Sequence, residues 1–199
     1  SCAILFAINM LKAIKELHQD GFIHRDIKPN NFLIQTNIKY PLVLIDFGIA
    51  KQYIDNNGNH IPLEEDCQFV GTYKYASLNV MKGKTPSRSD DLISWFYSVV
   101  ELYTGRLPWP GAANIDKTLN LKESISPTKL MKNMPKEFLS IYTKLNNLQF
   151  SDEPPYDSIM SLLYKLKSKI PKTGKSKYDW EYLSEDKIKE ISPIGSIIM

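Results

Sequence analysis

Hydrophobic positions near the start of the chain follow the period of an α-helix. From Ile4 onward, apolar residues lie three or four positions apart, which places them on one face of a helix. The run stops at Asp20-Gly21, and a glycine commonly ends a helix. The pattern predicts an amphipathic helix with an apolar face made of Ile4, Ala7, Ile8, Leu11, Ile14 and Leu17.

Two short apolar runs come next, at residues 31–34 and 42–46. Turn-forming residues separate them, among them Asn37 and Pro41. Runs of this length bounded by turn signals predict the two strands of a small hairpin. From 51 to 75 the pattern is irregular for longer than an ordinary connection, which indicates a functional loop.

Helical periodicity returns in the second half of the chain and predicts three helices. Ser89 can cap the first of them, and Gly105 can end it. The other two begin near Pro135 and Tyr156. The expected ranges are 91–104, 135–148 and 156–170, so we predict an α+β fold that is mainly α.

Composition changes beyond Pro171, where the chain becomes polar and rich in lysine. One further short helix is expected there, at about 184–191. We therefore divide the chain into a folded part, residues 1–170, and a C-terminal extension, residues 171–199.

Overall composition excludes several classes of protein. Apolar residues make up 43% and charged residues 24% of the 199 positions, which is typical of a soluble globular domain. The net charge of +3 is too small to indicate nucleic-acid binding. Two cysteines without metal-ligand spacing predict neither a disulfide framework nor a zinc site. Without a signal peptide or a membrane span, we expect an intracellular protein, cytoplasmic or nuclear.

The strongest chemical signal is a pair of motifs at the two ends of the predicted hairpin. The first reads His24-Arg25-Asp26-Ile27-Lys28-Pro29-Asn30-Asn31, and Asp46-Phe47-Gly48 follows fifteen residues after its last asparagine. Phosphoryl transfer from ATP needs a carboxylate to accept the hydroxyl proton and oxygen ligands that hold Mg²⁺ against the phosphates. A hairpin with polar residues at both ends can supply all of these groups in one small volume.

Each polar residue of the two motifs has a role in this interpretation. Asp26 orients and deprotonates the substrate hydroxyl, and Lys28 neutralises charge on the transferring phosphoryl group. Asn31 and Asp46 are the candidate magnesium ligands. The alternative is a charged loop between a helix and a strand, but the two motifs in this order and spacing match the signature of protein kinases.

From Cys2 to Ile170 the sequence resembles the C-terminal lobe of the protein kinase superfamily. The resemblance implies ATP and Mg²⁺ as cofactors, and protein substrates with Ser or Thr acceptors. It also gives Arg25, Phe47 and Gly48 structural or regulatory positions in the two motifs. Leu33 and Ile45 would floor the adenine pocket, although apolar strand residues of an ordinary core would look the same.

Four separate segments are similar to the casein kinase 1 group, which includes the tau-tubulin kinases. In addition, Ser77-Leu78-Asn79 stands where most kinases have Ala-Pro-Glu at the end of the activation loop. The insertion around Asn57-Gly58 resembles tau-tubulin kinases more than casein kinases, and the choice between them rests on that loop. The four segments are 88–94, 105–109, 134–138 and 150–156.

The resemblance gives roles to two further residues. Asp91 would bind the backbone of the His24-Arg25-Asp26 turn, and as an acidic residue at a helix N-terminus it would also be favoured by the helix dipole. Thr72 would contact Asp26 and Lys28 and help to select the hydroxyl, whereas the alternative is a simple turn threonine.

Regulation and substrate preference are partly indicated by charge. Residues 48–70 contain no serine or threonine, so phosphorylation of such residues cannot order this loop. We expect an acidic side chain among Glu64, Glu65 and Asp66 to pair with Arg25 instead. Lys74 lies where some relatives bind an anion, which would favour acidic or pre-phosphorylated substrates, while the alternative is a solvated lysine.

Nothing before His24 resembles the Gly-rich loop, the ATP-binding lysine or the partner glutamate of a kinase N-terminal lobe. We therefore expect a fragment that lacks this lobe and that alone transfers phosphate poorly, because both lobes bind ATP. The alternatives are a catalytically silent module that binds partner proteins, and a small-molecule phosphotransferase. We expect a monomer that binds neither nucleic acid nor membrane.

Overall fold

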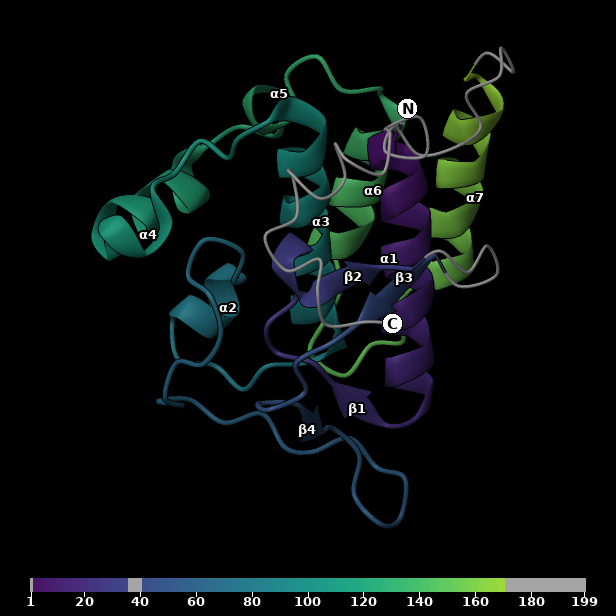
Figure 1. The fold of residues 1–199 in the computed structure, drawn as a ribbon. Coiled ribbons are helices and arrows are strands. Elements are labelled where there is room, and N and C mark those ends of the chain that lie inside the picture. Colours follow the sequence, from purple (N-terminus) through teal and green to yellow (C-terminus); the bar gives the residue numbers. More distant parts are fainter. Residues whose placement is uncertain (1, 36–40, 171–199) are drawn as a thin grey trace, which may run out of the picture.

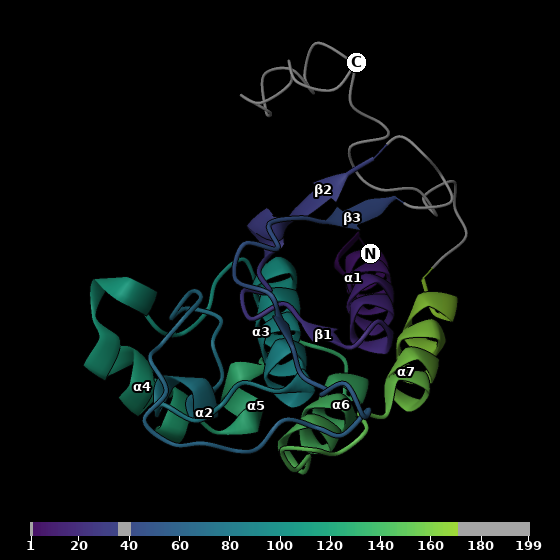
Figure 2. The same ribbon diagram turned by 90° about the horizontal axis from the view of Figure 1, so that it is seen from below.

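The computed structural model describes residues 2–35 and 41–170 as an α+β fold that is mainly helical. Four helices form a bundle, in which α1 packs against α3 and α7, and α6 packs against the same two helices (Figures 1 and 2). Their bounds are Cys2–Gln19 for α1, Arg88–Thr104 for α3, Glu137–Asn146 for α6 and Tyr156–Ser168 for α7. The predicted fold class is confirmed at this level.

Helix α3 lies at the centre of the bundle because its first thirteen residues, 88–100, are all buried. Trp95 and Phe96 are fully buried, and the indole nitrogen of Trp95 donates to the carbonyl of Ala7 in α1 at 3.1 Å. The helix ends at Gly105, which adopts a left-handed conformation, as predicted.

The start of α3 differs from the prediction. Ser87, and not Ser89, is the N-cap, and it forms a capping box with Asp90 three positions later. The helix begins at Arg88, three positions before the predicted start at 91. The residue that precedes its first turn is therefore Ser87. Ser89 lies inside the first turn, and its hydroxyl contacts that of Ser87 at 2.8 Å.

The predicted hairpin is confirmed with shorter strands. Strand β2 (Phe32–Ile34) pairs antiparallel with β3 (Leu42–Leu44), and a short 3-10 helix, η1 (Pro29–Asn31), leads into it. A second strand pair, between β1 (Phe22–Ile23) and β4 (Lys51–Gln52), was not predicted, because two-residue strands leave no periodic pattern. Along the chain, the first motif lies between β1 and β2, and the second lies between β3 and β4.

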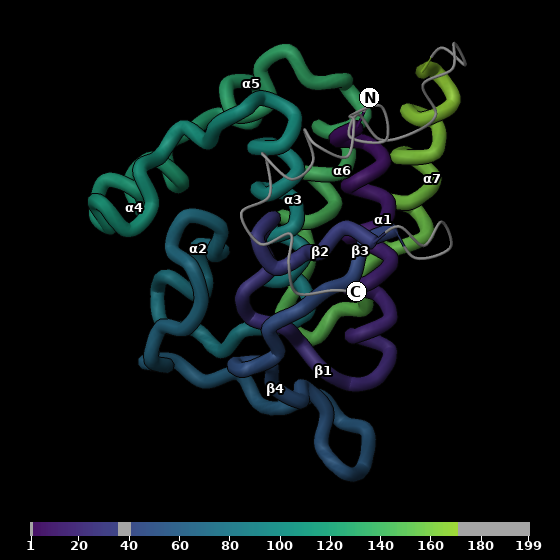
Figure 3. The backbone as a smooth tube through the Cα atoms, in the orientation of Figure 1, coloured from purple at the N-terminus to yellow at the C-terminus, as the bar shows by residue number. Residues whose placement is uncertain are grey.

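After β4 the chain runs as one long irregular stretch to α2 (Leu78–Met81), drawn in blue beside β1 and β4 in Figure 3. Three further short elements follow α3 in sequence: η2 (Gly111–Ala113), α4 (Ile115–Ser124) and α5 (Pro127–Leu130). Helix α4 buries only Thr118 and Lys122, so it has no apolar face that the sequence could reveal. The helix expected at 184–191 and the extension from 171 lie outside the described residues.

Helices α6 and α7 begin close to the predicted positions. Helix α6 starts at Glu137 rather than at Pro135, and α7 starts at Tyr156. Over the described residues, no helix is both long enough and apolar enough to cross a membrane.

Candidate active site

The turn after β1 carries the first motif in an unusual backbone conformation. Arg25 has a φ of 70°, in the left-handed region that non-glycine residues seldom adopt. The fully buried ring of His24 accepts from the N–H of Asp26 at 3.2 Å through Nδ1. Its Nε2 must then carry the hydrogen and donate to the carbonyl of Ile45 at 3.0 Å. The His24 ring therefore joins the two motifs.

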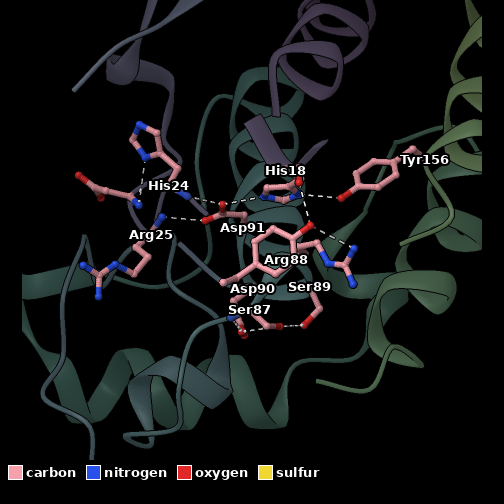
Figure 4. A network of polar contacts seen from close by, with 11 residues as sticks. His18, His24, Arg25, Ser87, Arg88, Ser89, Asp90, Asp91 and Tyr156 are labelled. Carbon is pink, nitrogen blue, oxygen red and sulfur yellow. Dashed lines mark hydrogen bonds and ion pairs between the residues drawn. The ribbon is translucent and has the colours of Figure 1, made fainter. Parts of the chain in front are cut away.

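Asp91 holds this turn from α3. Its Oδ2 accepts from the N–H of His24 at 2.7 Å, and its Oδ1 accepts from the N–H of Arg25 at 2.9 Å (Figure 4). The contact that the resemblance implied is present. Because Asp91 is 2% exposed, the two backbone groups stabilise a carboxylate that water cannot reach.

The same carboxylate also binds the end of α1. His18 Nε2 lies 2.9 Å from Asp91 Oδ2, and His18 Nδ1 lies 2.6 Å from the hydroxyl of Tyr156 in α7 (Figure 4). Burial raises the pKa of the Tyr156 hydroxyl, so this group stays a donor. Three helices therefore converge on one turn, and the strained φ of Arg25 is held by the surrounding structure.

The carboxylate of Asp26 is bound on both oxygens. Its Oδ1 accepts from the hydroxyl of Thr72 at 2.6 Å, and its Oδ2 accepts from Lys28 Nζ at 2.6 Å. Lys28 Nζ also donates to the Thr72 hydroxyl at 3.1 Å, which closes a triangle of three side chains. Asn31 donates to the Asp26 backbone carbonyl at 2.9 Å. The structure thus brings four of the predicted site residues together.

Asn31 and Asp46 lie at the same end of the β2–β3 hairpin. The N–H of Ile45 donates to the Asn31 carbonyl at 2.9 Å, so Asp46 follows the residue that faces Asn31. The Asn31 amide nitrogen is used on Asp26, which leaves its side-chain oxygen for other partners. Asp46 is exposed and has a φ of 66°.

An amide oxygen and a carboxylate at one hairpin end form a donor set of hard oxygens. Mg²⁺ is usually held by one or two such protein ligands together with phosphate oxygens and water. Within residues 2–35 and 41–170, no cluster of three or more His, Cys, Asp or Glu residues offers a complete protein site for a metal. The residues present fit a magnesium ion that a phosphate shares.

The remaining residues of the second motif are accessible. Phe47 is 51% exposed and packs edge-on against His24, with 5.4 Å between ring centroids. Gly48 is exposed. Leu33 is 39% exposed on β2, so it is not part of the core, and Ile45 is half-buried beside Asp46. An exposed leucine next to the candidate magnesium ligands favours the pocket-floor interpretation of Leu33 over the core interpretation.

The segment 71–76 contacts the first motif directly. Gly71 has a φ of +98°, and a Cβ there would collide with the Arg25 carbonyl oxygen, so only glycine fits. The next residue is Thr72, which reaches Asp26. The close approach of Gly71 therefore sets the position of the Thr72 hydroxyl.

Three residues that support this segment were not found from the sequence. Lys122 donates to the carbonyls of Tyr73 and Ala76, and Trp109 Nε1 donates to the carbonyl of Lys74 at 2.8 Å. Glu101 accepts from both the Lys74 ammonium and the Tyr75 hydroxyl. Trp109 lies in the segment 105–109 that resembles casein kinase 1, but that resemblance does not indicate this contact. No motif marks the other two residues, since they come from α3 and from a polar helix.

Two charge predictions are corrected. Arg25 Nε donates to the Ile49 carbonyl, and no ion pair joins Arg25 to residues 64–66 in the described parts of the chain. The N–H of Glu64 instead donates to Thr85. Burial lowers the pKa of Arg25, and the nearby Asp91 carboxylate opposes that effect. Lys74 is ion-paired with Glu101, so it is neither a free anion site nor a simple solvated lysine.

The Ser77-Leu78-Asn79 segment has a structural explanation. Ser77 caps α2 by accepting from the N–H of Val80 at 3.1 Å, and it donates to Asp90 at 2.5 Å. Asp90 is buried, and burial raises its pKa to about 6, against the opposing effect of hydrogen bonds from Ser77 and Ser87. Ser77 therefore fastens α2 to the start of α3.

Two of the segments that resemble casein kinase 1 also contact each other. The guanidinium of Arg88 pairs with Glu153 and donates to the carbonyls of Ser151 and Asp152 at 3.1 Å each. It also lies over the ring of Tyr53, 4.7 Å from its centroid. The two segments form one connection between α3 and the chain that enters α7.

Comparison with known proteins agrees with this geometry. The family described as "Protein kinase domain" matches residues 2–171. Casein kinase I homolog 3 of Schizosaccharomyces pombe is 37% identical over 193 residues, which cover 92% of this chain and 44% of that protein. A "Probable serine/threonine-protein kinase" of Dictyostelium discoideum is 33% identical over 179 residues, covering 87% of this chain and 36% of that protein. The chain thus spans less than half the length of these relatives.

Proposed function

This chain belongs to the protein kinase family, in the casein kinase 1 group, and on that basis we propose that it is the C-terminal lobe of an ATP-dependent Ser/Thr protein kinase. The reaction is the transfer of the γ-phosphoryl group of ATP to a serine or threonine hydroxyl of a protein. The observation that carries the proposal is the side-chain triangle of Asp26, Lys28 and Thr72 beside Asn31.

Asp26 is the proposed base. Its side chain is 11% exposed and follows a turn that Asp91 fixes, so the carboxylate is in a position to accept the proton of an approaching hydroxyl. Lys28 and Thr72 both contact this carboxylate, and they orient it toward one position. During transfer, Lys28 also offsets negative charge on the moving phosphoryl group.

Asn31 and Asp46 are the proposed magnesium ligands, and Leu33 and Ile45 the apolar floor under the adenine. When bound, Mg²⁺ neutralises the phosphate oxygens and sets the phosphate geometry. The chain's own contribution is to place two oxygen ligands at one hairpin end and the base beside them. Phe47 packs on His24 and thereby connects the metal end of the site with the turn that holds the base.

We assign residues 1–170 to the kinase lobe and 171–199 to an extension. The described residues include the proposed base and the proposed metal ligands but no Gly-rich loop over the phosphates, so we expect tight ATP binding to need residues of an N-terminal lobe. The proposed enzyme acts as a monomer inside the cell, in the cytoplasm or nucleus. Its acceptor proteins carry serine or threonine, and the similarity of the loop around Asn57-Gly58 to tau-tubulin kinases rather than casein kinases stays a prediction.

The alternative is a catalytically silent module that binds partner proteins. Asp26 contacts Lys28 and Asn31, and Asp46 lies at the same hairpin end as Asn31, which favours catalysis. The test is phosphoryl transfer by the full-length protein that contains this chain, with Mg-ATP and a generic protein substrate. Transfer to serine or threonine supports the kinase. No transfer to any protein, together with no Mg-ATP binding, favours the silent module.

A further inference from the structure

Lys122 is a buried lysine that the proposed chemistry does not use. It lies in α4 and is 4% exposed, and Thr118 is the other buried residue of this helix. Its Nζ lies over the rings of Tyr97 and Trp109, at 4.9 and 5.1 Å from their centroids. Burial lowers its pKa to about 7.

Burying an amine is costly unless hydrogen bonds replace those made with water. Here the replacement partners are two backbone carbonyls, those of Tyr73 at 2.8 Å and Ala76 at 2.5 Å. An apolar side chain of similar length would fill this aromatic site without that cost. The amine therefore contributes something that packing alone does not, namely a fixed position for two carbonyls of the segment 71–76.

Those two carbonyls flank the part of the segment that follows Thr72. The N–H groups of Tyr75 and Ala76 both donate to the Thr72 carbonyl, at 2.9 and 3.0 Å, so the segment forms a tight turn. The Thr72 side chain reaches from this turn to Asp26. Lys122 thus holds the turn through its backbone while the Thr72 side chain contacts the base.

We propose that Lys122 is a positioning residue that holds the segment 71–76 in the conformation in which a protein substrate is received beside Asp26. This inference rests on the proposed kinase function and extends it to substrate binding. Lys122 touches neither Asp26 nor the candidate magnesium ligands and acts only through the two carbonyls. Even a neutral amine has two hydrogens, one for each carbonyl, so the link does not require a charged lysine.

The kinetic test compares Lys122→Met with Lys117→Met in the full-length protein. Both changes lie in α4, but Lys117 is exposed, so it serves as the matched control. For Lys122→Met we expect the KM for a protein substrate to rise on the order of tenfold, because two hydrogen bonds to the substrate segment are lost. The KM for ATP should stay within about twofold, and Lys117→Met should match the wild type in both constants.

Thermal unfolding separates positioning from general stability. Replacing a buried amine by an apolar side chain is often neutral or stabilising, so we expect Lys122→Met to keep the Tm of the wild type. An unchanged KM for the protein substrate in Lys122→Met would overturn the proposal. So would an equal rise in the KM values for protein and ATP.

Hydrogen exchange gives an answer that does not depend on activity. The amides of residues 73–76 should exchange faster in Lys122→Met than in Lys117→Met, while those of α3 stay protected in both. If Lys122→Met does not fold, the same measurement compares Lys122→Gln with Lys122→Ala. The glutamine keeps donor hydrogens, so the amides of residues 73–76 should exchange more slowly in Lys122→Gln. Equal exchange of these amides in Lys122→Met and Lys117→Met, or in Lys122→Gln and Lys122→Ala, would contradict the positioning role. Absence of phosphorylation of any protein would contradict the proposed kinase function instead, so the two failures can be told apart.

Discussion

The Thr72 hydroxyl donates to Asp26 Oδ1 at 2.6 Å, although 46 positions separate the two residues in the sequence. Lys28 binds both of them, so the position of the carboxylate depends on the segment 71–76 as much as on its own turn. A change in either element should therefore alter the position of the Asp26 carboxylate. The predictions below follow from this relationship and from the contacts around it.

Removing the Thr72 hydroxyl should impair use of the protein substrate. Hydrogen bonds to charged groups are worth about 1.5–3 kcal/mol, so Thr72→Ala should lower kcat/KM for the protein substrate by about tenfold or more. Thr72→Ser keeps the hydroxyl and should stay close to the wild type. The measurement is kcat/KM for the wild type, Thr72→Ala and Thr72→Ser. Equal values for the two variants would show that the hydroxyl of Thr72 does not contribute.

Sequence patterns were sufficient for the helices that bury an apolar face and for the hairpin. The first motif and Asp46 could also be recognised, because they are contiguous or lie at a fixed spacing, and their chemical roles stay a prediction. What the patterns could not supply were contacts made by polar residues from distant elements. Glu101 and Lys122 belong to this group, since nothing in the local sequence distinguishes a polar residue that is paired with a distant segment from a solvated one.

The prediction for Arg25 failed for a related reason. The sequence shows three acidic residues, 64–66, in the long loop, but it does not show whether the loop brings them near Arg25. In the structure, the N–H of Glu64 and the carbonyl of Gly83 tie this stretch to the chain around α2. The backbone of this stretch is therefore held beside Gly83 and Thr85, and none of its acidic residues forms an ion pair with Arg25.

Stability should depend on pH through Asp90. Burial raises its pKa to about 6 from an ordinary value near 4, so the folded state binds its proton more tightly than the unfolded state. The stabilisation from this proton is full below pH 4 and is lost as the pH rises through 6, by about 3 kcal/mol. Asp90→Asn cannot titrate, so its free energy of unfolding should not show this loss.

Urea unfolding of both proteins between pH 4 and pH 7 measures the difference. The stability of Asp90→Asn relative to the wild type should improve across that range, whatever constant offset the lost hydrogen bonds cause. Two curves that stay parallel would mean that folding does not raise the pKa of Asp90.

Substrate charge preference should depend on Glu101. Because Glu101 pairs with Lys74, we expect the wild-type protein not to favour acidic or phosphorylated peptides. Glu101→Gln releases Lys74 and should lower the KM for a peptide with a phosphoserine near the acceptor by about threefold, the scale of an exposed ion pair. Glu123→Gln releases Lys82 at another Lys–Glu pair and is the matched control. A wild-type preference for the phosphorylated peptide would show that Glu101 does not neutralise Lys74 in the complex.

The central claim is that Asp26 is the base of phosphoryl transfer, and Asp26→Asn in the full-length protein tests it most directly. The substituted amide keeps the size of the side chain but cannot accept the proton, so turnover should fall by about 10²-fold or more. Mg-ATP affinity should change little, and Asp20→Asn, which alters an exposed aspartate just after α1, should keep wild-type turnover. Wild-type turnover in Asp26→Asn would contradict the account.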